Sequence, residues 1–289
     1  MRKQLVADIA LLAVVMVWGY TFVAIKNALL TVTPINFIFI RFVISLLVIL
    51  VIFRKRLRRL NFGIIRHGGI IGTFLFLAYV SQTAGLKYTT ASNAGFITGF
   101  SVVLVPVFSS LLLRKKPSVE STIGVTLAVA GLFLLSFNGV SSMNRGDILV
   151  FLCAVCVAFH ILSVGYYVKK HDSVLLTIVQ IGTVTLLSFI SALVTGEISV
   201  PSDGVVWRAI LVCAVFATVG AYLVQTTMQK FTSATHTALI FSGEPVFAGV
   251  FGYCLLGENP GSWAFAGFSL ILAGMIVSEI KISGRDEEV

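Results

Sequence analysis

Long apolar stretches separated by short polar connections set the pattern of this chain. Each stretch contains about 17 to 24 residues with few charges, and a helix needs about 20 apolar residues to cross a bilayer. Because lipid offers the backbone no hydrogen-bond partners, stretches of this length and continuity should be α-helices. The pattern predicts ten membrane spans: Leu5–Lys26, Pro34–Phe53, Gly68–Leu86, Ser92–Leu113, Ser121–Phe137, Asp147–Val168, Val174–Thr195, Val205–Met228, Thr235–Leu256 and Ser262–Ile282.

The first apolar stretch begins as a secretory signal peptide would, with Arg2 and Lys3 ahead of it. It has no obvious small-residue cleavage site, so we expect it to be retained as a membrane span. The longest connection, Arg54–His67, holds about 14 residues, which is too short for a soluble domain. The sequence therefore predicts an all-α integral membrane protein.

The composition agrees, because 57% of the 289 residues are hydrophobic, 11% are charged and the mean hydropathy is +1.01. Soluble domains carry about 25% charged residues. This scarcity of charge excludes an ordinary cytosolic enzyme, a disordered tail and a nucleic-acid-binding protein. No HExxH, GxSxG or phosphate-loop motif is present, and Cys153 and Cys156 lie in a predicted span without metal-ligand partners. We therefore expect neither enzymatic activity nor a metal site.

The net charge of +9 reflects where the basic residues lie. With ten spans, the two termini and the even-numbered connections share one side of the membrane and hold 16 of the 21 Lys and Arg residues. The opposite side holds four, and Arg41 lies within a span. By the positive-inside rule, both termini should be cytoplasmic in a multi-pass protein of the cytoplasmic (inner) membrane. These charges therefore mainly indicate orientation. The lipid bilayer is an expected partner of the protein, and the oligomeric state is left open.

The second half of the sequence repeats part of the first at a constant offset. Ala78–Thr83 aligns with Ala221–Thr226, and the match continues without a gap to Ala130-Gly131 against Ala273-Gly274. It gives 18 identities over 54 positions, well above what shared apolar bias would produce. The chain is therefore predicted to consist of two five-helix repeats, residues 1–139 and 140–289.

An odd number of spans in each repeat makes the second repeat cross the membrane in the opposite direction. The charges agree, because the basic segment Arg114–Lys116 aligns with Gly257–Asn259, which contains an acidic residue. Inverted repeats are typical of secondary carriers, in which two similar halves expose a central site to each side in turn. The predicted architecture is therefore ten transmembrane helices arranged as two inverted five-helix repeats.

Motifs along the chain carry a further signal. The stretch Trp18–Lys26 lies in the first span, Arg41-Phe42 in the second, Glu244–Phe247 and Leu255–Glu258 in and after the ninth, and Ala273-Gly274 in the tenth. Together these motifs resemble the EamA-type family of the drug/metabolite transporter superfamily over nearly the whole chain. The resemblance implies a ten-helix carrier, commonly an exporter of amino acids or related metabolites, without identifying the substrate. The first repeat departs from the family pattern, because Arg114–Lys116 replaces the usual Gly-Glu ending.

Two charged residues are predicted to lie well inside the bilayer, where an ionisable group is costly and is a candidate for function. Arg41 is about 10 Å from the outer surface by helix rise, and Glu244 about 14–18 Å from either surface. Arg41 should bind a substrate carboxylate, pair with Glu244 or extend towards the outer surface. Glu244 should couple protons, bind substrate or form a protonated hydrogen bond beside the helix break predicted at Pro245. Pro106 predicts a second helix break in the first repeat.

Polar pairs recur in the two halves. Tyr79 and Gln82 are three residues apart and share a helix face, and Tyr222 and Gln225 repeat this pair in the second half. We expect the pairs to line a shared cavity, one near each of its mouths. The alternative is that they bind helices to one another, which is common for polar side chains in membranes.

The remaining candidates are four residues of different kinds. Trp18 would supply an apolar wall for the substrate, while Asn93 and Thr98 make one part of the fourth span polar. His160 would either line the cavity and titrate near neutral pH or form a hydrogen bond within the bundle.

The sequence thus predicts a secondary transporter that exports amino acids or related small metabolites by alternating access. Its expected partners are a small-molecule substrate and lipid, with no nucleic acid and no cofactor beyond a coupled proton. Two other classes stay open: a passive metabolite channel or facilitator, and a lipid flippase or scramblase.

Overall fold

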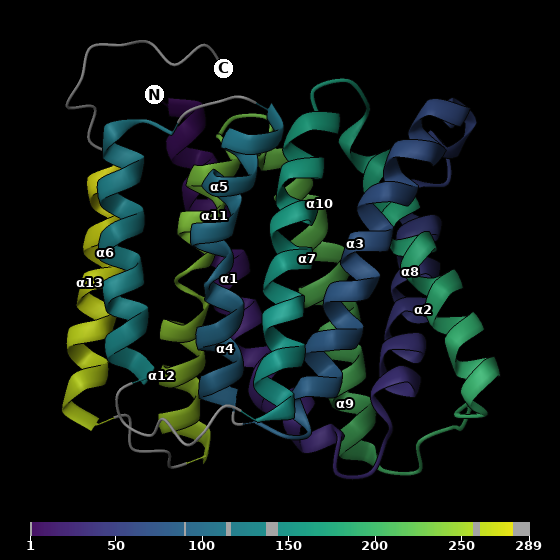
Figure 1. Cartoon of the computed structure of the whole chain (residues 1–289). Helices are drawn as coiled ribbons and strands as arrows, with labels where there is room; N and C mark the ends of the chain where they lie inside the picture. The colour runs from purple at the N-terminus through teal and green to yellow at the C-terminus, as the bar shows by residue number, and fades with distance from the viewer. Residues whose placement is uncertain (1, 90, 114–116, 137–143, 257–260, 280–289) are drawn as a thin grey trace.

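The computed structural model describes residues 2–89, 91–113, 117–136, 144–256 and 261–279. These residues form a helical bundle (Figure 1). Its helices are α1 (Arg2–Ala28), α2 (Pro34–Phe53), η1 (Arg56–Arg59), α3 (Phe62–Leu86), α4 (Ala91–Gly99), α5 (Ser101–Leu113), α6 (Val119–Ser136), α7 (Arg145–Tyr167), α8 (Ser173–Thr195), α9 (Gly204–Ala214), η2 (Val215–Gly220), α10 (Ala221–Met228), α11 (Ala234–Phe241), α12 (Glu244–Leu256) and α13 (Gly261–Glu279).

Eight helical segments of the described chain are long and apolar enough to cross a membrane. They are α1, α2, α3, α4 with α5, α7, α8, α9 to α10, and α11 with α12. The apolar parts of α6 and α13, Val119–Leu134 and Phe265–Val277, are shorter. The protein is therefore an all-α, multi-pass membrane protein, with two of the ten predicted spans shorter than the others.

The helix ends follow local sequence signals. Thr33 caps α2 through its side chain, and Pro34 occupies the first helical position, where no backbone N–H is needed. Asn144 and Asp147 form a reciprocal capping box at the start of α7. Asp172 caps α8, which ends at Gly196 in the left-handed conformation (φ 67°) that glycine adopts readily. These signals place the connections at the two faces of the bundle.

The two halves of the chain run in opposite directions. Five long helical segments, formed by α1, α2, α3, α4 with α5, and α6, precede α7. The helix α7 therefore starts at the face opposite to the one where α1 starts (Figure 1). The boundary predicted between residues 139 and 140 lies outside the described residues.

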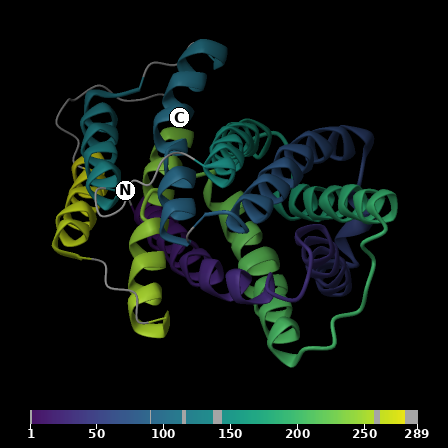
Figure 2. The ribbon, with the colours of Figure 1, turned by 60° about the horizontal axis from the view of Figure 1, so that its bottom comes forward.

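Helices from the two halves pack against one another throughout the bundle. The helix α3 contacts α7 and α8, α2 contacts α8, and α1 contacts α12. The pair formed by α6 and α13 lies at one edge of the bundle in both views (Figures 1 and 2). There a Cβ atom added to Gly131 would lie 2.6 Å from the Gly267 carbonyl oxygen, so only a glycine allows this approach.

Two of the membrane-crossing segments are interrupted at equivalent positions of the repeat. The break between α4 and α5 falls at Phe100, and the break between α11 and α12 falls at Ser242 and Gly243. Phe100 and Gly243 align with each other in the ungapped match between the two halves. Pro245 is the second residue of α12, directly after its break, whereas Pro106 lies within α5, beyond the break of the first repeat.

Candidate functional site

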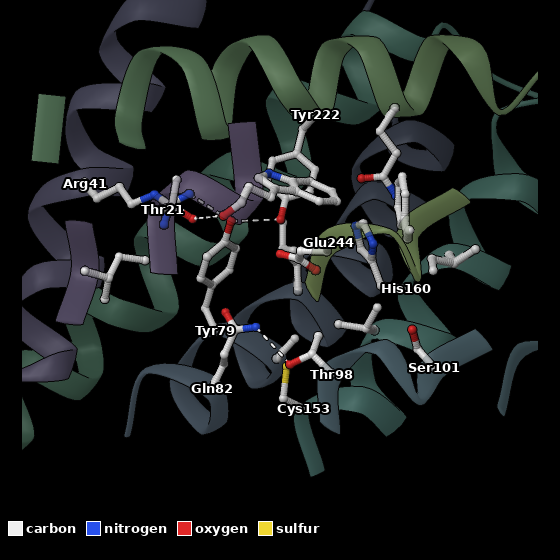
Figure 3. A pocket seen from close by; sticks show the side chains of 18 residues that line it. Thr21, Arg41, Tyr79, Gln82, Thr98, Ser101, Cys153, His160, Tyr222 and Glu244 are labelled. Atoms are coloured by element: carbon white, nitrogen blue, oxygen red, sulfur yellow. Dashed lines mark hydrogen bonds between the residues drawn. The ribbon is translucent and has the colours of Figure 1, made fainter. Parts of the chain in front are cut away.

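A central pocket lies between the two halves of the chain (Figure 3). The space between its lining side chains, counted together with the open space at its mouth, is about 670 Å³. Both halves supply its walls, through the residues Trp18, Thr21, Ile25, Arg41, Leu75, Ala78, Tyr79, Gln82, Thr98, Ser101, Cys153, Val157, His160, Ile161, Tyr222, Gln225, Phe241 and Glu244.

Most residues singled out in the sequence lie in this pocket. They are Trp18, Arg41, Tyr79, Gln82, Thr98, His160, Tyr222, Gln225 and Glu244. The side chain of Asn93 lies outside the described residues. The two prolines are not among the lining residues; they shape the helices α5 and α12 that border the pocket.

Sequence reasoning missed two polar lining residues that the repeat itself marks. Thr21 follows Asp8 at the same spacing at which His160 follows Asp147. Ser101 begins α5, and its equivalent in the second repeat, Glu244, begins α12. Comparing each candidate with its repeat equivalent would have identified both.

Arg41 is held in α2 with its guanidinium buried in the pocket wall. The residue is 1% exposed. One terminal nitrogen donates to the Tyr79 hydroxyl at 2.9 Å (Figure 3) and to the Ala217 carbonyl at 3.3 Å. The Arg41 Nε donates to the Thr218 hydroxyl at 2.8 Å. The guanidinium carbon also lies 4.7 Å from the centre of the Tyr79 ring. Arg41 thus neither extends to the surface nor forms an ion pair with Glu244 in the described part of the chain.

The π-helix η2 supplies two of the acceptors for Arg41. A π-helix shifts the backbone hydrogen bonds by one residue and commonly marks a functional site. The Ala217 carbonyl accepts from the Trp18 indole at 3.0 Å as well as from Arg41. The Thr218 hydroxyl, which accepts from Arg41, donates to the Cys213 carbonyl at 2.8 Å. The irregular backbone therefore orients both contacts.

The two repeated tyrosines meet at the centre of the pocket. The Tyr222 hydroxyl donates to the Tyr79 hydroxyl at 2.9 Å, so this hydrogen bond is one of those that join the two halves (Figure 3). The expectation of one Tyr–Gln pair near each mouth was therefore wrong for the tyrosines. The tyrosine side chains are long enough for their hydroxyls to meet between α3 and α10, which sequence spacing alone does not reveal.

The glutamines of the same pairs have different surroundings. The Gln82 amide nitrogen donates to the Thr98 hydroxyl at 3.2 Å within the first repeat. The Gln225 amide nitrogen donates to the Gln229 side-chain oxygen at 3.2 Å, and the Gln225 side chain is fully buried. His160, near the second pair, shares a 2.9 Å hydrogen bond with Gln180.

Glu244 brings a carboxyl group to the pocket from the broken segment formed by α11 and α12. It is 9% exposed and is the first residue of α12. The partial positive charge of a helix N-terminus favours a carboxylate at this position. The pocket thus contains one permanently cationic side chain and one acidic one. Among the described residues no group of three or more His, Cys, Asp or Glu side chains is arranged to hold a metal ion.

Comparison with known proteins identifies the class to which this architecture belongs. A model of the EamA-like transporter family matches residues 5–137 and again residues 144–279. The chain belongs to the EamA-like transporter family. An uncharacterized transporter of Archaeoglobus fulgidus is 35% identical over 280 residues, covering 97% of this chain and 88% of the relative. A second from the same organism is 26% identical, covering 94% and 96% of the two chains.

Similarity to this EamA-like transporter extends to bacteria and to a solved structure. The uncharacterized transporter YyaM of Bacillus subtilis is 26% identical and covers 73% of this chain and 70% of its own. One crystal structure superposes with a TM-score of 0.76 at 19% identity, covering 94% of this chain and 96% of the other. At that identity the match establishes the shared fold. Family and relatives together make the protein a membrane transporter of the drug/metabolite type.

Proposed function

We propose that this EamA-like protein is a secondary transporter that exports amino acids or related small metabolites bearing an anionic group. It would act by alternating access in the cytoplasmic membrane, with both termini in the cytoplasm. The observation that carries this proposal is the buried guanidinium of Arg41 in the wall of the central pocket.

Arg41 is a cation surrounded by neutral acceptors. The groups that accept from it are two hydroxyls and one backbone carbonyl, and the described chain offers it no carboxylate. Burying an unpaired charge is costly, so a membrane protein retains one where it has a function. A substrate carboxylate would accept two parallel hydrogen bonds from the guanidinium and neutralise it. This argues for an anionic group on the substrate.

Glu244 supports the second part of the proposal, an interaction with a cationic group or a proton. An acidic side chain at 9% exposure has little water to stabilise its ionised form. It would gain most from the ammonium group of an amino acid or from a coupled proton. The two charged side chains of the pocket are thus suited to the two charges of a zwitterion.

The helix interruptions support alternating access. Discontinuous helices near the middle of the membrane are typical of secondary transporters with inverted repeats. Here the breaks at Phe100 and Gly243 are repeat equivalents, and Ser101 and Glu244, which follow them, both line the pocket. Equivalent breaks in oppositely oriented halves would let the site open to either side.

Counterflow in proteoliposomes tests the proposal. Proteoliposomes that contain the purified protein are loaded with one unlabelled amino acid, and uptake of the same amino acid in labelled form is measured. The measurement is repeated for each of the common amino acids. We expect stimulation by internal substrate for at least one of them, and a large loss of affinity in Arg41→Gln.

Each alternative has its own outcome in this experiment. Flux without stimulation by internal substrate would indicate a channel, and exposure of labelled lipid without metabolite flux would indicate a flippase or scramblase. Either result would contradict the proposal. Impermeant labelling of single cysteines placed at residues 1 and 289 in intact cells would test the orientation, and labelling of either would overturn it.

A further inference from the structure

Gln225 carries a hydrogen-bond acceptor that no group in the described part of the chain uses. The residue lies in α10, is 0% exposed and lines the central pocket. Its side-chain oxygen Oε1 is buried and has no partner among the described residues. A buried carbonyl oxygen without a donor is destabilising, and native proteins contain few of them. Such an atom in a pocket wall points to a ligand.

A relay of amides fixes the orientation of Gln225. The Gln229 nitrogen Nε2 donates to the backbone carbonyl of Ile161 at 3.2 Å. A backbone carbonyl only accepts, so Gln229 must direct its NH₂ group there and its oxygen towards Gln225. Gln225 in turn donates to that oxygen at 3.2 Å. The network therefore assigns the nitrogen of Gln225 to Gln229 and leaves its oxygen without a partner in the described chain.

The first repeat has no such relay. Its equivalent of Gln225 is Gln82, which donates to the Thr98 hydroxyl. The position equivalent to Gln229 is Leu86, which has no polar group. In the described chain only the second half therefore orients its glutamine in this way, so duplication of the sequence does not account for the orientation of Gln225.

We propose that Gln225 Oε1 is a specificity-determining acceptor that selects substrates with an N–H donor near their anionic group, and that Gln229 positions it. This inference rests on the proposed function, in which Arg41 binds the anionic group. A substrate with an amine or amide N–H satisfies the buried oxygen. An analogue without that donor leaves the oxygen unpaired, and sites built in this way reject such analogues strongly.

Binding of matched ligand pairs to the purified full-length protein tests the inference. The probes are the common amino acids, each paired with the carboxylate that lacks its amino group, such as L-leucine with 4-methylpentanoate. We expect the wild type to prefer the amino form by about tenfold or more. In Gln225→Leu this preference should fall by about threefold or more, and the remainder would come from Glu244. Gln225→Glu, which keeps an acceptor, should retain the preference.

Two further variants separate positioning from packing. Gln229→Leu, which copies the first repeat, should reduce the preference in the same direction as Gln225→Leu. Asn36→Leu removes a buried amide that binds Ser199 and does not line the pocket, so it should leave the preference unchanged. Gln229→Leu also keeps the inference testable if Gln225→Leu does not fold.

The outcomes distinguish this inference from the proposed function. Arg41-dependent binding of both members of each pair with equal affinity would overturn the role of Gln225 and the pairing of Glu244 with an ammonium group, and would leave the binding of an anionic group by Arg41 standing. A preference that is unchanged in both Gln225→Leu and Gln229→Leu would also overturn it. No Arg41-dependent binding of any probe would contradict the proposed function itself, and the inference with it.

Discussion

Arg41 in α2 and Gln180 in α8 occupy equivalent places in the two halves of the chain. Each lies seven residues after the first residue of its helix, and each is almost completely buried, at 1% and 0% exposure. Arg41 donates to Tyr79 and to the π-helix η2, and it lines the pocket. Gln180 bonds to His160 and donates to Thr226, and it is not among the lining residues.

The comparison shows that a symmetric architecture holds an asymmetric site. Both halves keep a buried polar side chain at the same depth, but only one of the two is charged. The third membrane-crossing segment of each half differs as well. In the first half α3 is a continuous α-helix, whereas its equivalent in the second half contains the π-helix Val215–Gly220. Under the proposed mechanism, the inverted repeats would expose the site to each side of the membrane, and the differences between the halves would determine what it binds.

Making the two halves alike should have the largest effect. Arg41→Gln gives α2 the same residue type that α8 has, and it should raise the half-saturation concentration of an anionic substrate about 30-fold or more. Loss of one partner of a buried charge pair costs about 2–5 kcal/mol. The half-saturation concentration of Arg41→Lys should lie between those of Arg41→Gln and the wild type, because lysine keeps the charge but not the bidentate geometry. Unchanged affinity in Arg41→Gln transport assays would reject the role of Arg41.

The second charged difference between the halves is Glu244, whose repeat equivalent is Ser101. Glu244→Gln should abolish the dependence of transport on a pH gradient. Coupling to one proton should change the accumulation ratio of the substrate about tenfold for each unit of pH difference across the membrane. The measurement is substrate accumulation in proteoliposomes with and without an imposed gradient. Full transport with wild-type gradient dependence in the variant would exclude proton coupling through Glu244.

The π-helix contact should have a smaller effect. Thr218→Val keeps the shape of the side chain but removes the acceptor for Arg41 Nε, so the half-saturation concentration should rise about three- to tenfold. Thr183→Val is a matched control, because the Thr183 hydroxyl bonds to the Val179 carbonyl of its own helix. An equal loss of affinity in both variants would show that the effect is general rather than specific to Arg41.

The tyrosine bridge gives the smallest predicted effect and compares two repeat-equivalent residues directly. Tyr79→Phe removes both the Arg41 contact and the bridge, and should raise the half-saturation concentration about threefold. Tyr222→Phe removes only the bridge, so its effect should be less than about twofold. Substrate titrations of the two variants provide the measurement. The reverse order would contradict the assignment of Arg41 and Tyr79 to one functional unit.

Much of the fold was accessible from the sequence because its signals are local or periodic. Apolar length predicts the spans, and the repeat predicts the equivalence of the two halves. The shortest predicted span, Ser121–Phe137, corresponds to the short helix α6, whereas the shortness of the apolar part of α13 and the position of the first helix break were not predicted. Pro106 was expected to break its segment, but the break lies at Phe100, and α5 continues through the proline.

Most of the predicted site residues line the central pocket, but their geometry was not predicted. Arg41 and Glu244 were nominated because charged residues are rare in apolar spans, and Tyr79 and Tyr222 because their pair recurs in the two halves; all four line the pocket. The residues Val215–Gly220 carry no recognised sequence signature of the π-helix that contacts Arg41. The relay through Gln229 was also missed, because its meaning depends on a carbonyl of another helix, that of Ile161.

The most direct test compares the binding affinities of amino acids with those of their carboxamides, in which a neutral amide replaces the carboxylate. Both forms are titrated on the purified wild type and on Arg41→Gln at the same pH. The account predicts that the wild type prefers the carboxylate by about tenfold or more and that the variant loses this preference. Equal binding of both forms by the wild type, or a preference that survives in Arg41→Gln, would contradict it.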